Sequence, residues 1–65
     1  MYTAIKEKFD IINQAAIARK VGLTVETLNR IINGKQTTGK KSAYCIVKAI
    51  HEDAEIEEYF IRNGE

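Results

Sequence analysis

The segment 14–33, with the sequence QAAIARKVGLTVETLNRIIN, constrains the fold most, because two short helical patterns meet there at a single glycine. In the first pattern three apolar side chains fall on one helical face: Ile17, Ala18 and Val21. Gly22 follows directly, and glycine most easily adopts the left-handed backbone conformation that ends many helices. The sequence therefore predicts a short helix over residues 14–21, with Asn13 as its N-cap and a tight turn after it.

A second helix is predicted directly after this turn. Thr24 suits its N-cap, and Leu23 and Leu28 stand at the two positions of a hydrophobic staple. Its inward stripe consists of Leu28, Ile31 and Ile32. We expect the helix to span residues 25–33, because Gly34 follows. Its outward face consists of Val25, Glu26, Thr27, Asn29, Arg30 and Asn33.

Three more apolar stripes predict further helices. The stripe of a helix over residues 3–12 consists of Ile5, Phe9 and Ile12. After a polar loop at residues 35–41, the stripe of a helix over residues 42–50 consists of Ala43, Ile46, Val47 and Ile50. The stripe of a fifth helix, with Asp53 as its cap, consists of Ile56, Tyr59 and Phe60. We therefore expect an all-α fold, a compact five-helix bundle in one domain over residues 1–65.

The composition limits the chemistry that the chain can perform. A domain of 65 residues buries only roughly 60% of the surface of its unfolded chain, which leaves no room for a large catalytic cleft. The single cysteine, Cys45, and the single histidine, His51, cannot form a disulfide framework or a zinc site within one chain. No nucleophile is paired with a base, and no phosphate-binding loop is present. The sequence thus predicts a protein that is not an enzyme and takes no metal, cofactor or small-molecule ligand.

Two features of the sequence argue against a membrane location. The apolar runs are far shorter than the roughly 20 residues that span a bilayer. Residues 1–10 lack the apolar core of a signal peptide. We expect a soluble, cytoplasmic protein with no membrane partner.

Charge is distributed unevenly along the chain. Residues 1–41 carry eight basic and three acidic side chains, a net charge of +5, whereas residues 42–65 carry two basic and six acidic side chains, a net charge of −4. Such a chain can present its basic part to a polyanion and hold its acidic part away from it. The alternative interpretation is that these charges cover ordinary solvated helix faces.

Several positions of the segment 14–33 match a known pattern. Ala18 is small where the two helices cross, Gly22 stands at the turn, and Asn33-Gly34-Lys35 follows the second helix. This arrangement resembles the helix-turn-helix of the phage-repressor family (Cro and cI type, also called XRE). One predicted helix before the motif and two after it are similar to that family's five-helix plan. The resemblance implies a sequence-specific DNA-binding transcriptional regulator, a phage-type or mobile-element repressor.

The resemblance also implies which residues contact double-stranded DNA. The second helix of the motif would lie in the major groove and read base edges through Val25, Glu26, Thr27, Asn29 and Arg30. The residues expected to contact phosphates are Gln14, Thr24, Asn33, Lys35, Lys40 and Lys41. The chain departs from the family at Val25 and Glu26, where uncharged amide or hydroxyl side chains are frequent, and lacks the usual proline near Thr38.

The chemistry of these side chains suits base recognition. Arg30 can donate two hydrogen bonds to guanine, Glu26 can accept one from the cytosine amino group, and Val25 can pack on a thymine methyl. The alternative for Arg30 is an ion pair with Glu26, four residues earlier on the helix. For Lys40 and Lys41 the alternative is a solvated loop end.

A short helix-turn-helix reads only a few base pairs, so we expect two chains to bind together. A two-fold pair would place the recognition helices about 34 Å apart and require an inverted-repeat operator. The candidate dimer contacts are Ile56, Tyr59 and Phe60, for which core filling is the default interpretation. We expect a weak homodimer that forms fully on DNA, because so short an element buries little surface.

Other functions remain open at this point. The same helices could belong to an antitoxin-like or recombination-accessory protein, or to a module that contacts another protein. We interpret Cys45 as an incidental, partly exposed thiol rather than a reactive one. We interpret His51 as a structural residue at a helix end.

Overall fold

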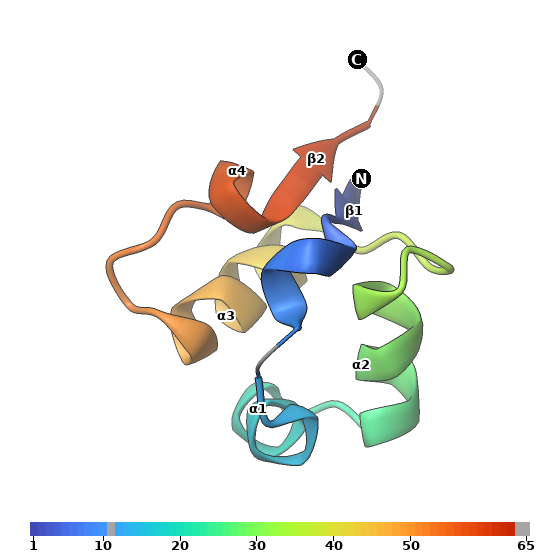
Figure 1. The fold of residues 1–65 in the computed structure, drawn as a ribbon, viewed down its shortest axis with the longest axis vertical. Coiled ribbons are helices and arrows are strands. Elements are labelled where there is room, and N and C mark those ends of the chain that lie inside the picture. Colours follow the sequence, from blue (N-terminus) through green and yellow to red (C-terminus); the bar gives the residue numbers. More distant parts are fainter. Residues whose placement is uncertain (11, 64–65) are drawn as a thin grey trace.

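The computed structural model describes residues 1–10 and 12–63, and Figure 1 shows their fold. The helices are the 3-10 helix η1 (Lys6–Phe9) and the α-helices α1 (Gln14–Val21), α2 (Val25–Ile32), α3 (Lys40–Ile50) and α4 (Ile56–Tyr59). The strands are β1 (Tyr2–Ala4) and β2 (Phe60–Arg62). Residue 11, which belongs to the predicted first helix, and Glu65, which belongs to the acidic part at residues 42–65, lie outside the described residues.

A two-stranded sheet contradicts the predicted all-α five-helix bundle. β1 and β2 pair in antiparallel fashion, with Tyr2 opposite Arg62 and Ala4 opposite Phe60, so the two ends of the described chain lie side by side (Figure 1). Within the described residues, four α-helices and one 3-10 helix accompany this sheet. The predicted fold class is therefore wrong.

The predicted first helix, residues 3–12, is replaced by β1 and η1. Tyr2 and Ala4 are buried, and only half-buried Thr3 lies between them, which is the period-two pattern of a strand. Phe9 reaches the core from η1, whereas the N–H of Ile5 donates to the carbonyl of Tyr59 at 2.8 Å. Of the three apolar residues at helical spacing, only Phe9 belongs to a helix, because Ile5 precedes η1 and Ile12 follows it.

The predicted fifth helix is shortened to the single turn α4. Glu55, rather than the predicted Asp53, precedes the turn, and Oε2 of Glu58 accepts a hydrogen bond from the N–H of Glu55 at 3.1 Å. The backbone becomes extended at Phe60, with φ −132° and ψ 151°, and continues into β2. Pairing with β1 overrides the helical pattern, because strand formation depends on partners that are distant in the sequence.

The two helices predicted before and after Gly22 are both present. α1 has the predicted bounds, and Oδ1 of Asn13 accepts a hydrogen bond from the N–H of Ala16 at 3.1 Å. Gly22 has φ 78° and ψ 28°, the left-handed conformation predicted for it. Oγ1 of Thr24 accepts from the N–H of Thr27 at 3.1 Å, so Thr24 is the N-cap of α2. The chain therefore turns sharply between α1 and α2 with both helix ends capped.

The remaining helix boundaries differ slightly from the predicted ones. α2 begins at residue 25 as predicted but ends at Ile32, and Asn33 is its C-cap. α3 begins at Lys40, so the predicted loop at residues 35–41 ends at Gly39, its N-cap. The inward side of α3 buries Ala43, Ile46 and Val47.

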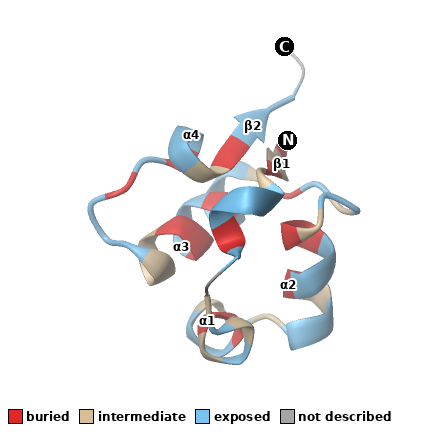
Figure 2. Cartoon of the chain, in the orientation of Figure 1, coloured by how far each residue is buried: buried red, intermediate tan, exposed pale blue. Residues whose placement is uncertain are grey.

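A continuous core lies between the helices and the sheet. Residues from every element contribute to it, and Leu28, Ile46, Val47 and Phe60 are among its most buried side chains. The ring of Phe9 packs edge-on against Tyr59 at 5.4 Å and Phe60 at 5.6 Å between centroids. Figure 2 shows that α2 is buried along its inner side only. Its other side is exposed to solvent.

Candidate nucleic-acid interface

The outer face of α2 is open to solvent. Val25 is 48% exposed, and the side chains of Arg30 and Glu26 are 47% and 86% exposed. The opposite stripe is buried in the core: Leu28, Ile31 and Ile32. The helix is thus held by its apolar side while its polar side remains available for a ligand.

Three amide side chains connect α1 to the outer face of α2. Nδ2 of Asn29 donates to Oε1 of Gln14 at 3.2 Å. Nδ2 of Asn33 donates to two oxygens of Asn29, to Oδ1 at 3.0 Å and to the backbone carbonyl at 2.9 Å. We call Gln14, Asn29 and Asn33 the amide chain. It places two predicted phosphate contacts and one predicted base contact in a single hydrogen-bonded row.

A second polar group surrounds the guanidinium of Arg30. Nε donates to Oε1 of Gln36 at 3.1 Å, and Nη2 lies 3.5 Å from Oγ1 of Thr27. Nη1 lies 4.0 Å from Oε2 of Glu26, at the limit of an ion pair. We call Glu26, Thr27, Arg30 and Gln36 the arginine cluster. Because the ion pair with Glu26 is long and exposed, it contributes little to stability and leaves the guanidinium available for a ligand.

The loop after α2 has a defined conformation. Gly34 has φ 76°. Its N–H donates to the carbonyl of Ile31 at 3.1 Å, and the N–H of Lys35 donates to the carbonyl of Arg30 at 3.0 Å. These two bonds form a Schellman motif. At the other end of the loop, Thr38 and Tyr2 exchange backbone hydrogen bonds of 2.8 and 2.9 Å. The loop is therefore tied to the fold on both sides of Gln36.

Three predicted phosphate contacts lie on this loop and at the start of α3. Lys35, Lys40 and Lys41 are all exposed. Gly39 offers no side chain to the first turn of α3, and that turn contains no acidic residue. The positive end of the helix dipole therefore adds to the charge of the two lysines.

The acidic part of the described chain lies away from α2. Glu57 and Glu58 belong to α4, and Glu55 precedes it. In Figure 1, α4 and α2 lie on opposite sides of the molecule, with η1 and α3 between them. An anion that approaches α2 therefore stays away from these three carboxylates, and the acidic side chain that it meets on α2 itself is Glu26.

The structure brings most of the predicted site residues together but separates the predicted dimer contacts from the surface. Ile56 and Phe60 are buried, and half-buried Tyr59 packs against Phe9. These three side chains fill the core of their own chain, which was the default interpretation. Ile61, the next residue, is 56% exposed on β2.

Sequence reasoning missed Gln36. It was placed in a polar loop, and no periodicity connects a loop residue with a helix residue six positions earlier. Only the conformation imposed by Gly34 brings the two side chains within hydrogen-bond distance.

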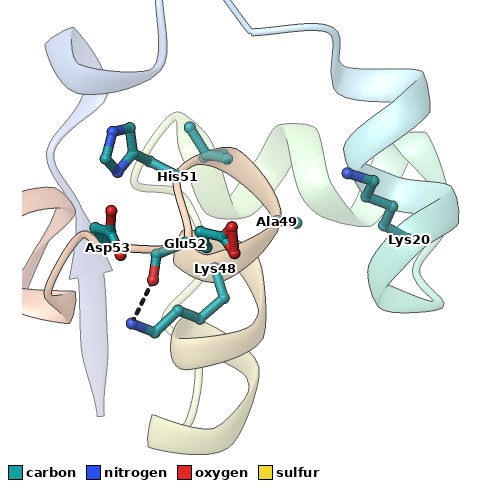
Figure 3. A pocket seen from close by; sticks show the side chains of 7 residues that line it. Lys20, Lys48, Ala49, His51, Glu52 and Asp53 are labelled. Atoms are coloured by element: carbon teal, nitrogen blue, oxygen red, sulfur yellow. Dashed lines mark hydrogen bonds between the residues drawn. The ribbon is translucent and has the colours of Figure 1, made fainter.

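A shallow depression of about 430 Å³ lies at the end of α3, away from this site (Figure 3). Its polar lining consists of Lys20, Lys48, His51, Glu52 and Asp53. Nζ of Lys48 donates to the carbonyls of Glu52 at 2.9 Å and Ala54 at 3.2 Å, so this ammonium group stabilises the end of α3. Cys45 is exposed elsewhere on α3. We assign no ligand to this region.

Among residues 1–10 and 12–63, no three His, Cys, Asp or Glu side chains are grouped closely enough to hold a metal ion. The described helices include none that is long and apolar enough to cross a membrane.

No protein-family model, curated protein or solved structure that was compared with the chain matches it. The resemblance to the phage-repressor family therefore rests on the residues of the segment 14–35 alone.

Proposed function

We propose that this protein is a sequence-specific regulator that binds double-stranded DNA and inserts α2 into the major groove. The observation that carries the proposal is the outer face of α2, where the arginine cluster holds Arg30. The turn at Gly22, with a cap on either side, fixes α2 against α1. A helix of this diameter fits the major groove, where every base pair presents a distinct pattern of donors and acceptors. The role we propose is that of a phage-type or mobile-element repressor.

Base recognition would be centred on Arg30. Its terminal nitrogens can donate to O6 and N7 of guanine, while Glu26 accepts from a cytosine amino group and Val25 contacts a thymine methyl. Thr27, whose Oγ1 lies 3.5 Å from Nη2 of Arg30, would contribute a base contact beside it. Asn29 already bonds to Gln14 and Asn33, so its main role would be to orient these two amides toward the DNA backbone.

Phosphate contacts would flank α2 on both sides. Gln14 and Asn33 belong to the amide chain, and Thr24 lies at the N-terminus of α2. Lys35, Lys40 and Lys41 would neutralise phosphates on the side of the loop. These contacts set the position of α2 in the groove without reading sequence.

We further propose that two chains bind one inverted-repeat operator as a weak dimer. Ile56, Tyr59 and Phe60 fill the core, so within this region the exposed contact would be Ile61 on β2. β1 lies between β2 and α2 and contacts both, so a contact through Ile61 would not cover the outer face of α2.

The proposal is tested by selecting bound duplexes from a random-sequence pool. We expect enrichment of a defined site that contains a guanine, and Arg30→Ala should weaken binding to that site by about 1–3 kcal/mol and binding to random DNA much less. Arg62→Ala is the matched control, since it removes the same charge from β2. If no sequence is enriched, the proposal of a sequence-specific regulator fails. An equal loss of affinity for the selected site and for random DNA would show that Arg30 contacts a phosphate and not a base.

A further inference from the structure

The arginine cluster contains a residue outside α2 that orients its central side chain. Gln36 is half-buried on the loop after α2, and its Oε1 accepts the hydrogen bond of Arg30 Nε at 3.1 Å. Nε of arginine can only donate, so the partner atom must be the amide oxygen of the glutamine. The interaction therefore has one possible polarity, in which the amide oxygen faces Arg30.

This contact decides which edge of the guanidinium remains for a ligand. An arginine can meet the two acceptors of guanine either through Nε and one terminal nitrogen or through both terminal nitrogens. With Nε occupied by Gln36, the pair Nη1 and Nη2 is the edge left for two parallel bonds. The weaker contacts at these nitrogens, to Glu26 at 4.0 Å and Thr27 at 3.5 Å, can yield to a base.

The loop is built to hold this arrangement before DNA arrives. The Schellman motif at Gly34 and Lys35 fixes the backbone on one side of Gln36, and the bridge between Thr38 and Tyr2 fixes it on the other. Holding a flexible arginine in its binding conformation lowers the conformational entropy that is lost on binding.

We propose that Gln36 is a positioning residue that sets the specificity of this site by presenting the terminal edge of Arg30 to guanine. The inference rests on the proposed function, since it assumes that Arg30 meets a base. Specificity for that base pair would then depend on the loop as well as on α2.

The first test measures base preference at the position that Arg30 contacts. Gln36→Met keeps the length of the side chain and removes the acceptor, and we expect the preference for guanine to fall about 5-fold, the effect of one ordinary hydrogen bond. In the Arg30→Ala background the same change should have no effect on preference. Thr37→Ala is the control in the same loop. An equal loss in both backgrounds would show that Gln36 contacts DNA itself and would overturn the proposal, as would an unchanged preference.

The second test needs no DNA. Hydrogen exchange of the Arg30 Nε–H, followed by NMR, should be about 5-fold faster in Gln36→Met and should be restored in Gln36→Glu, which keeps an acceptor oxygen. Gln36→Met should unfold at the same temperature as the wild-type chain, because Gln36 is not part of the core. The faster exchange would therefore not result from a loss of stability. If the wild-type chain selects no DNA sequence, the proposed function fails, and this exchange measurement still decides the contact. Unchanged exchange in Gln36→Met would refute the role of Gln36.

Discussion

Replacing Gly22 by L-alanine and by D-alanine tests the turn that sets α1 against α2. An added Cβ would meet no heavy atom within 4 Å, so neither enantiomer is expected to clash. The cost therefore comes from the backbone alone, at φ 78° and ψ 28°. This region costs an L-residue about 1–2 kcal/mol, and the reduced freedom of the unfolded chain offsets about 0.4–1 kcal/mol of that.

We expect Gly22→Ala to lower the free energy of unfolding by about 1 kcal/mol, and D-alanine at the same position to raise it by about 0.4–1 kcal/mol. For a domain of this size the L-variant should unfold about 4–8 °C lower. Chemically synthesised chains would be compared by urea denaturation, with equal m-values as the check on two-state behaviour. Equal stabilities of the two enantiomers would show that residue 22 does not have a positive φ and would refute this account of the turn.

Thr24→Ala should cost about 1 kcal/mol in urea denaturation, because the first turn of α2 loses its cap; no loss would mean that the cap is not formed in solution. The logarithm of DNA affinity should fall with the logarithm of salt concentration by about 0.9 for each phosphate neutralised, and Lys35→Ala should flatten that slope by about 1, whereas an unchanged slope would remove Lys35 from the phosphate contacts. Ile61→Lys should weaken pairing of two chains on an inverted-repeat duplex in sedimentation experiments without unfolding the chain, because Ile61 is exposed; unchanged pairing would place the dimer contact elsewhere.

The part of the fold that the sequence predicted correctly is the part specified by neighbouring residues. Asn13, Gly22 and Thr24 act on backbone atoms within a few positions of themselves, so the bounds of α1 and the start of α2 follow from local chemistry. Gly34 ends α2 in the same way. These signals do not depend on where the rest of the chain lies.

The ends of the chain were predicted wrongly because their structure depends on each other. Ala4 and Phe60 are paired in the sheet although 56 positions separate them, and each strand has only three residues, too few for alternation to be recognised from the sequence alone. In both end segments the apolar residues stand at helical spacing, which predicted helices. In the structure Phe9 reaches the core from η1 and Phe60 reaches it from β2, and their rings meet there. Local periodicity cannot distinguish these cases.

The candidate site was predicted as a set of residues but not as a set of interactions. The sequence placed Arg30 and Asn29 on the outer face of α2, and both are exposed there. It did not predict that Asn29 bonds to Gln14, or that Gln36 bonds to Arg30, since each pair spans two elements. Such contacts follow from the angle between the helices and from the path of the loop.

The central claim, that the outer face of α2 meets the major groove, is tested most directly by mapping amide chemical shifts during titration with a selected duplex. We predict that the largest changes fall on residues 25–30, with further changes at Lys35, Lys40 and Lys41 and none at residues 55–58 of the acidic segment. The largest changes at α4 or β2, with α2 unaffected, would contradict the account.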